Sequence, residues 1–228
     1  DDAFPIDYLI SSTGASVSTF PPSRLLRAVA MTSDEVQESV ATLLELALDF
    51  MIQDPVPNNH CFAWHANDQP NPDFERRLAL YDAHQRPLIL PLNDPTPATQ
   101  LLAISSAHAG ERLQRTLQTR LPKLTVIRTT SPLDHHSTWL EIFPGNVSKS
   151  KSACWLCGEL NLDTRQTVTI GNDYNDIDLL EWGAYSYVVG NAPGDLRNQF
   201  TPVSSHDDNG FTQAVNRWLA RSSASLPR

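Results

Sequence analysis

The sequence predicts an α/β protein, with helices on the faces of a parallel sheet and a second, α+β unit inserted into it. Three observations lead to this prediction. From residue 149 onward, short apolar runs alternate regularly with helical patterns, which is typical of parallel strands joined by helices. Between about residues 21 and 137 the alternation continues, but the loops are rich in proline, asparagine, aspartate and histidine. A short apolar run near the start adds one strand before that segment.

Composition narrows the class of protein. The 228 residues are 40% hydrophobic and 19% charged, which suits a globular chain with a core rather than a disordered one. The net charge is −9 and no run of lysine and arginine occurs, so we expect no nucleic-acid partner. An acidic protein that handled phosphate esters would need local positive charge from a metal ion, a lysine or a helix N-terminus.

Targeting signals and membrane spans are not evident in the sequence. No apolar stretch approaches the roughly 20 residues that cross a bilayer, and the first residues lack the pattern of a signal peptide. We therefore expect a cytoplasmic protein without a membrane partner, present as a monomer or weak homodimer.

The cysteines and histidines do not indicate a disulfide framework or a metal site in the sequence. Three cysteines, Cys61, Cys154 and Cys157, are too few and odd in number for a disulfide framework. The Cys-x-x-Cys spacing at 154–157 could indicate a redox or zinc pair, but it falls in a helical pattern and is interpreted as two helix thiols. The histidines show no metal-binding spacing and are interpreted as surface residues: His60, His65, His84, His108, His135, His136 and His206.

The amino-terminal third contains one strand and one helix. Residues 6–10 form an apolar run closed by a Ser-Ser-Thr-Gly turn, which predicts a buried strand. From Ser33, apolar side chains recur every three or four residues as far as Met51. This spacing predicts a helix that is capped by Ser33 or Asp34 and ended by the prolines that follow.

The middle of the chain reads as an α+β unit on a mostly antiparallel sheet. Its variable loops are where a binding surface is expected. Strands are expected near 60–64, 100–104, 124–128 and 138–143, with helices near 73–83 and 110–121.

The last third alternates more strictly. The expected elements are a helix from 149 to about 160, strands at 167–170 and 185–189, and helices at 175–182 and 211–219. Ligands of such sheets gather at the carboxyl ends of the strands. The loops at Gly171 and Gly190 are therefore the candidate binding loops.

The first of these loops is the most informative segment. After Gly171, four oxygen-bearing side chains occur within five residues: Asn172, Asp173, Asn175 and Asp176. Such a group could hold Mg²⁺, which prefers oxygen ligands and typically uses one or two carboxylates. A solvated turn with an Asn or Asp helix cap would explain the same residues.

Two further segments favour a binding site. Lys149, in the segment 145–151, stands at the start of a helix, where anions are favoured. The segment 188–193, Val-Val-Gly-Asn-Ala-Pro, ends the next strand with a small polar turn.

Together, in this order and spacing, these segments resemble the second half of the Cof-type phosphatases, which belong to the type IIB capped group of the haloacid dehalogenase-like (HAD) superfamily. The matching stretches are 146–149, 171–176, 190–192 and 207–211, and residues 6–17 resemble the segment that leads into the family's cap. The resemblance is specific in 139–215, fair in 5–17 and architectural in between.

The resemblance implies a fold and an activity. The fold would be a HAD-like Rossmannoid core from residues 1–20 and 138–228, lacking its first strands, with an α+β cap inserted at 21–137. The activity would be Mg²⁺-dependent hydrolysis of a phosphomonoester, a sugar phosphate or another small phosphorylated metabolite, with the cap closing over the site.

The resemblance also implies residue roles. Lys149 would be catalytic and bind the phosphoryl group, and Asn175 and Asn191 would complete the phosphate or substrate site. The metal ligands would be Asn172, Asp173 and Asp176. Asn172 stands where the family has an acid, so either its carboxamide or a shifted Asp173 would contact the metal.

One part of the family pattern is missing. The family's nucleophile lies in an Asp-x-Asp motif on its first strand, and no Asp-x-Asp-Gly segment occurs in the 228 residues. We expect a fragment of a longer protein, inactive by itself, because a parallel sheet without its central strand would leave backbone groups unpaired. The alternative is a natural non-catalytic protein that binds phosphate or another ligand.

Overall fold

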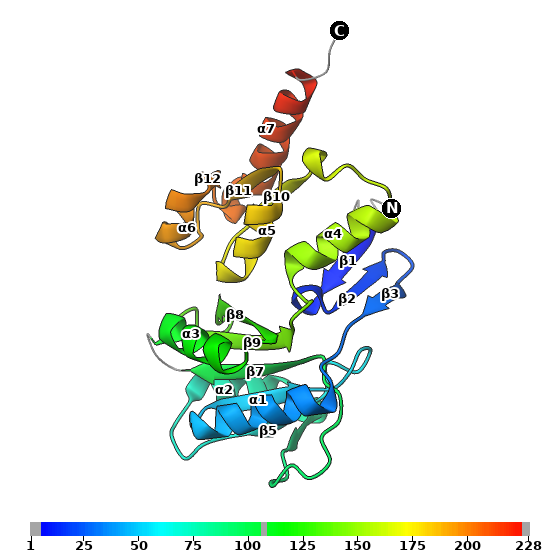
Figure 1. The fold of residues 1–228 in the computed structure, drawn as a ribbon. Helices are drawn as coiled ribbons and strands as arrows, with labels where there is room; N and C mark the ends of the chain where they lie inside the picture. Colours follow the sequence, from blue (N-terminus) through cyan, green and yellow to red (C-terminus); the bar gives the residue numbers. More distant parts are fainter. Residues whose placement is uncertain (1–5, 106–108, 225–228) are drawn as a thin grey trace. The chain divides into compact units, whose positions relative to one another are not determined.

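The computed structural model describes residues 6–105 and 109–224. It divides into two compact units, residues 1–147 and residues 148–228, called here the first and the second unit (Figure 1). Each unit has its own sheet and its own apolar core.

A six-stranded sheet organises the first unit. Its strand order is β6-β5-β4-β7-β9-β8, and every pair is antiparallel except β5 and β6, which run parallel. The mostly antiparallel sheet predicted for the middle of the chain is thereby confirmed. The strands are β4 (Asp49–Gln53), β5 (Phe62–His65), β6 (Gln85–Pro87), β7 (Gln100–Ser105), β8 (Leu124–Thr130) and β9 (Thr138–Pro144).

Helices cover both faces of this sheet. Alternate residues of β4 point to opposite faces, so Phe50 packs with α1 (Ser33–Glu45) and α3 (Gly110–Arg120), while Met51 packs with α2 (Pro72–Leu80). A short 3-10 turn, η2 (Asp82–His84), leads from α2 toward β6.

A small antiparallel sheet precedes these elements in the first unit. It consists of β1 (Tyr8–Ser11), β2 (Ser16–Thr19) and β3 (Arg24–Ala28), with the 3-10 turn η1 (Ser12–Gly14) between the first two. It is tied to the larger sheet by Ala15, which packs with Phe143, and by the Thr13 hydroxyl, which donates to Glu141 Oε2 at 2.8 Å.

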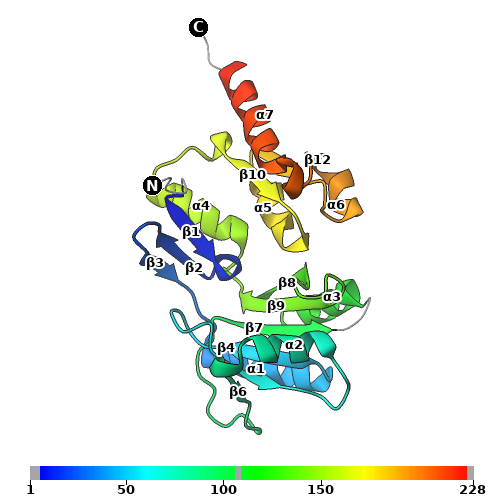
Figure 2. The ribbon, with the colours of Figure 1, turned by 180° about the vertical axis from the view of Figure 1, so that it is seen from behind.

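The second unit is a three-stranded parallel sheet with helices on its faces, β10-β11-β12 (Figure 2). Tyr187 packs with the apolar side of α7, whereas its neighbour Val188 packs with α6 on the other face. The elements are α4 (Lys149–Glu159), η3 (Thr164–Gln166), β10 (Val168–Gly171), η4 (Tyr174–Asp176), α5 (Ile177–Trp182), β11 (Tyr185–Val188), α6 (Gly194–Gln199), β12 (Thr201–Pro202), η5 (His206–Asp208) and α7 (Gly210–Ala224).

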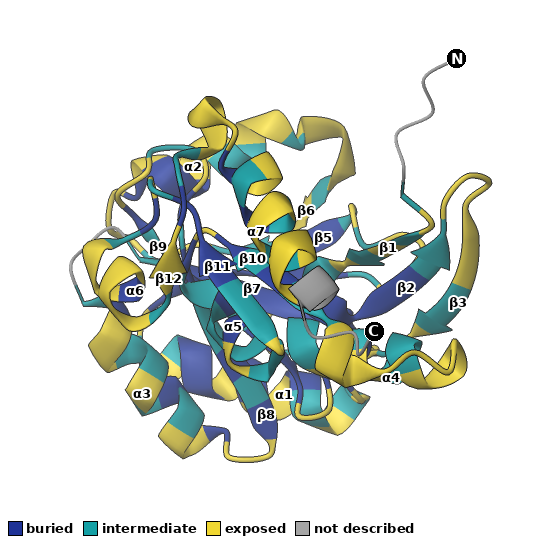
Figure 3. Cartoon of the chain, turned by 90° about the horizontal axis from the view of Figure 1, so that it is seen from above, coloured by how far each residue is buried: buried dark blue, intermediate teal, exposed yellow. Residues whose placement is uncertain are grey.

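Burial follows this layering within each unit. Residues of the central strands are largely buried, and the helices keep exposed residues on their outer sides (Figure 3). The predicted pairing of the strand at 167–170 with that at 185–189 is confirmed, because Val168 pairs in parallel with Tyr185 and Gly171 with Val188.

The structure corrects three details of the sequence prediction at the amino-terminal side. The first strand is not buried, since β1 is an edge strand whose residues alternate between half-buried and exposed. The helix from Ser33 ends at Glu45, and Met51 lies in β4. Its cap is Thr32, whose hydroxyl accepts from the N–H of Glu35 while the Glu35 carboxylate accepts from the N–H of Thr32.

The domain boundary expected at residue 138 stays a prediction. Strand β9, which begins at that residue, pairs with β7 and β8 in the six-stranded sheet. The reason is that it fills both faces of that sheet, with Leu140 and Ile142 in one apolar cluster and Trp139 in the other. The grouping of residues 1–20 with the last third of the chain stays a prediction.

No helix among the described residues is long and apolar enough to cross a membrane.

Candidate functional site

The loop after β10 is built around a glycine that has no space for a side chain. A Cβ on Gly171 would lie 2.6 Å from Asp176 Cβ and 3.0 Å from Leu180 Cδ1. The missing side chain therefore lets η4 and α5 fold back tightly against the end of the strand. Asp173 caps this turn, since its Oδ1 accepts from the N–H of Tyr174 at 2.8 Å.

Asp176 accepts hydrogen bonds from three residues around the loop. Its Oδ2 accepts from the backbone N–H of Asn172 at 2.7 Å and of Asp173 at 3.3 Å. Its Oδ1 lies 2.5 Å from Nζ of Lys149, and the Asp176 side chain is only 7% exposed. A carboxylate this buried is stabilised because each oxygen has a donor and one of the donors is charged.

Lys149, the first residue of α4, contacts Asp176 with its side chain. The helix is capped by Ser148, whose hydroxyl accepts from the N–H of Lys151 at 3.2 Å. The N–H of Ser150 donates to Oδ2 of Asp178 in the first turn of α5, at 3.0 Å. The amino end of α4 is thus bound to η4 by one ion pair and to α5 by one charge-assisted hydrogen bond. An acidic side chain already occupies part of the anion position expected there.

Asn191 lies on the loop after the neighbouring strand. That loop follows β11, which pairs with β10 as far as Gly171 and Val188. The Asn191 side chain is exposed, and its Oδ1 accepts from the N–H of His206 at 3.1 Å. It therefore binds the first residue of η5, and no hydrogen bond links it to the Lys149–Asp176 pair among the described residues.

Of the residues predicted for the site, the structure brings Lys149, Asn172, Asp173 and Asp176 into one hydrogen-bonded group. Asn175 lies within the same turn, half-buried, between Tyr174 and Asp176. Asn191 lies at the same edge of the sheet but does not belong to this hydrogen-bonded group. Sequence reasoning missed Asp178, which an i+2 spacing from Asp176 at the helix start could have suggested.

The donor chemistry of the loop fits a hard cation. Asn172 is exposed and offers an amide oxygen, and Asp173 offers a carboxylate beside it. Both oxygens of Asp176 already accept hydrogen bonds, so this residue is suited to orienting Lys149 and the loop backbone. One carboxylate and one amide agree with the small number of protein ligands that Mg²⁺ uses.

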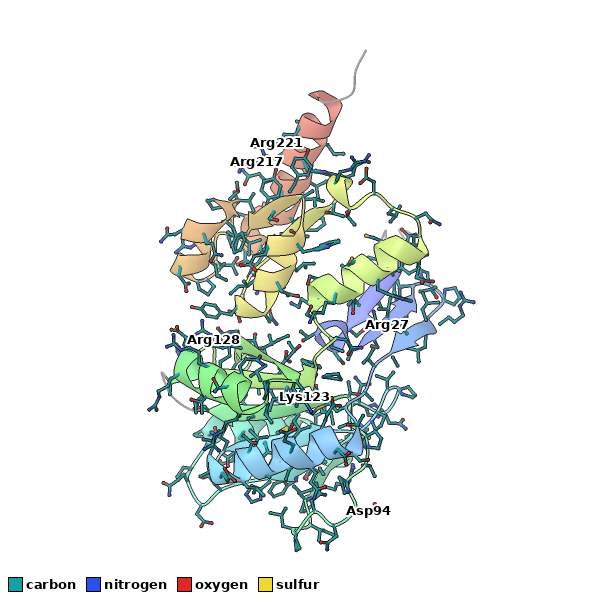
Figure 4. All side chains as sticks on the ribbon, viewed as in Figure 1. Arg27, Asp94, Lys123, Arg128, Arg217 and Arg221 are labelled. Carbon is teal, nitrogen blue, oxygen red and sulfur yellow. The ribbon has the colours of Figure 1, made fainter. Side chains whose placement is uncertain are left out.

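Further cations among the described residues of the second unit include Arg165 in η3 and two arginines of α7. Arg165 pairs with Asp163 at 2.9 Å, and the hydrogen bond to this carboxylate, with its negative charge, raises the pKa of Arg165. Arg217 and Arg221 project from α7 (Figure 4), and Arg217 donates to the carbonyl of Pro202 at 3.1 Å. Lys149 is the lysine that the fold places at the carboxyl end of β10.

Comparison with known proteins identifies the family. The model of the haloacid dehalogenase-like hydrolases matches residues 2–215. The chain belongs to this family. The resemblance to HAD phosphatases inferred from the motifs is thereby confirmed, and the HAD fold with it, by solved structures that superpose on more than nine-tenths of the chain.

Two curated relatives of the HAD chain carry provisional names as phosphatases. The Haemophilus influenzae protein is 22% identical over 152 residues, which are 65% of this chain and 52% of that protein. The Streptococcus pyogenes protein is 31% identical over 98 residues, 42% of this chain and 34% of that protein. The chain thus aligns with about half or less of the curated relatives it matches.

The solved structures agree on the fold at low identity. The HAD subclass IIB sugar phosphatase BT4131 superposes with a TM-score of 0.70 and 16% identity, covering 93% of this chain and 76% of that one. The phosphatase BT1666 of Bacteroides thetaiotaomicron gives 0.71 and 16%, with 95% and 75% covered. SMU.1108c of Streptococcus mutans gives 0.74 and 14%, with 93% and 77% covered.

Proposed function

We propose that this HAD-family protein acts on phosphomonoesters with Mg²⁺ as its cofactor. The observation that carries the proposal is the partly buried ion pair of Lys149 with Asp176 at the end of a parallel strand, beside the side-chain oxygens of Asn172 and Asp173. A fixed lysine and a cation would together neutralise a phosphate dianion that the net charge of −9 would otherwise repel.

Each residue has a distinct part in this proposal. Lys149 would bind the phosphoryl oxygens and stabilise their charge, and Asp176 would hold its ammonium group in place. Asn172 and Asp173 would hold Mg²⁺ together with Asp176, the third ligand that the resemblance implies. When bound, the cation polarises the phosphoryl group. Asn175 and Asn191 would contact the phosphate or the rest of the substrate.

The substrate we infer is a small phosphorylated metabolite, with a sugar phosphate as the first choice. BT4131 is described as a sugar phosphatase, and its fold likeness is the support. We further infer a cytoplasmic protein, monomeric or weakly dimeric, without nucleic-acid or membrane partners. The acidic charge supports the first of these exclusions.

The nucleophile has no counterpart in this chain. No Asp-x-Asp-Gly segment occurs in its sequence, and within the described residues β10 pairs on one side only, with β11. The family's Asp-x-Asp strand could occupy the other side. We infer that the 228-residue chain hydrolyses no phosphomonoester by itself, because its sequence lacks the Asp-x-Asp-Gly segment that carries the family's nucleophile.

The lack of that segment also favours a second candidate, a non-catalytic protein that binds phosphate with the same residues. An in-frame Asp-x-Asp-Gly upstream in the gene would support the enzyme, and a start codon beside Asp1 would support the binder.

An assay of the chain, and of any longer natural form, with p-nitrophenyl phosphate and Mg²⁺ tests directly whether each hydrolyses a phosphomonoester. Turnover by the 228-residue chain that disappears in Asp176→Ala would mean that the nucleophile is misassigned.

Binding tests the site in either case. Inorganic phosphate, titrated by calorimetry in the presence of Mg²⁺, should bind the chain and bind Lys149→Ala at least about tenfold more weakly, which corresponds to about 1.4 kcal/mol. Lys151→Ala is the matched control, an exposed lysine of the same helix turn that should leave phosphate binding unchanged. Equal weakening by the two lysine variants would refute the role given to Lys149.

A further inference from the structure

A cluster of nitrogen and sulfur ligands lies at the edge of the six-stranded sheet. Strands β5 and β6 run parallel with Phe62 opposite Gln85. The residues that immediately precede these two positions, Cys61 and His84, are therefore side by side. Cys61 Sγ lies 3.8 Å from His84 Nδ1.

His60 completes the cluster. Its ring meets the ring of His84 edge to face, with centroids 4.8 Å apart. One ligand atom from each of the three residues lies within 4.8 Å of the other two. Cys61 is half-buried, and both histidines are exposed.

We propose that His60, Cys61 and His84 form a binding site for Zn²⁺ or a related divalent transition metal. Zinc bound tetrahedrally at about 2.3 Å from sulfur and about 2.0 Å from nitrogen separates the two ligand atoms by about 3.6 Å. The Cys61–His84 separation of 3.8 Å already matches that value. The His60 ligand atom lies within 4.8 Å of the other two, and its exposed ring must move closer to them to complete the site.

The backbone holds two of the ligands in place. The N–H of Cys61 donates to Asn58 at 2.8 Å, its carbonyl accepts from Asp54 at 2.9 Å, and the N–H of His84 donates to Tyr81 at 2.8 Å. Asp54 is in turn paired with Arg86 of β6 at 2.5 Å. The loop before β5 is thus already joined to β6, so metal binding needs little further ordering.

The site differs in chemistry from the loop after β10. One thiolate and two imidazoles select zinc-class ions, whereas the amide and carboxylate oxygens of Asn172 and Asp173 suit Mg²⁺. Three protein ligands leave a fourth position for water or an external ligand. The bound ion would clamp the loop before β5 to η2 and hold β6, the short edge strand, against the sheet.

The test uses Co²⁺ as a spectroscopic probe for Zn²⁺, with excess Mg²⁺ present to saturate oxygen sites. The intact chain should bind one Co²⁺ with a thiolate-to-cobalt charge-transfer band, and Zn²⁺ should displace it. Cys61→Ser should abolish the band. His84→Ala should weaken Co²⁺ binding by at least roughly the 10- to 100-fold that even outer-sphere changes cost at metal sites.

Matched controls use the same residue types elsewhere. Cys154→Ser and His136→Ala change an exposed cysteine and an exposed histidine outside the cluster and should keep both the band and the affinity. Circular dichroism checks that each variant is folded, and if Cys61→Ser fails to fold, the affinity of His84→Ala decides. A band lost in Cys154→Ser, a band retained in Cys61→Ser, or no saturable band in the intact chain would each overturn the proposal.

Discussion

Lys149 Nζ lies 2.5 Å from Asp176 Oδ1, and this pair joins the first turn of α4 to the loop that ends β10. The Lys149 side chain is 27% exposed and that of Asp176 is 7% exposed. Such a pair adds little net stability when it is intact. Removing one partner is nevertheless destabilising, because the other charge is then left without its counter-charge.

Lys149→Ala should therefore lower stability. The buried carboxylate of Asp176 would lose its charged donor, at a cost of about 1.5–3 kcal/mol. Urea unfolding at pH 7 measures the change, and Lys151→Ala in the same helix should stay within about 0.5 kcal/mol. The interpretation fails if the Lys149 variant is as stable as the Lys151 variant.

Gly171→Ala should disturb the loop itself. The new Cβ would lie 2.6 Å from Asp176 Cβ, so η4 must move away from the strand, and we expect a loss of about 1–3 kcal/mol. Gly158→Ala in α4 is the contrasting change, since a Cβ there meets nothing within 4 Å. It should stabilise the chain by about 0.5–1 kcal/mol through helix propensity. Thermal melts of the two variants should shift in opposite directions.

Asp73→Ala should destabilise the first unit. The Asp73 side chain is buried and accepts from Trp139 Nε1 at 2.6 Å and from the Ser131 hydroxyl at 2.8 Å. Its loss leaves the indole N–H without an acceptor and should cost about 1–3 kcal/mol. Glu75→Ala removes an exposed acid from the same helix turn and controls for the interaction with the helix dipole. Similar unfolding midpoints for the two variants would argue against the buried hydrogen bonds as the cause.

Cys157 should react slowly with iodoacetamide. Burial, with a smaller contribution from Cys154, raises the pKa of the Cys157 thiol above its ordinary value. Less thiolate is then present near pH 8, and the rate should keep rising as the pH passes the ordinary range of a cysteine. Mass spectrometry of Cys154→Ser isolates the Cys157 reaction, and Cys157→Ser isolates that of the exposed Cys154. Faster labelling of Cys157 than of Cys154 at pH 8 would contradict this.

Local patterns explain why the last third of the chain was predictable. Strands β10 and β11 are short apolar runs between helical patterns, and both end in glycine-containing polar loops. Their parallel pairing and the meeting of Lys149 with the loop at 171–176 follow from the order of the elements. The strands β2, β3, β6 and β12 were not predicted, because short polar or edge strands are defined by their pairing partners rather than by their own residues.

The helix from Ser33 shows where periodicity misleads. Met51 continues its three-and-four spacing, yet Ala47 adopts a positive φ of 51° and the chain turns into β4. Every residue of β4 is buried, and a fully buried strand has no polar face by which it can be told from a helix.

By itself, the sequence determined the family, the parallel arrangement of β10 and β11, and the residues that crowd the loop after Gly171. These features depend on residues that are close in the sequence or on motifs in a set order. Only the tertiary structure decided that Asp176 binds Lys149 with one oxygen and the loop backbone with the other. It also decided that His60 and Cys61 meet His84, because the register of two parallel strands brings together residues 23 positions apart. No local pattern encodes that register.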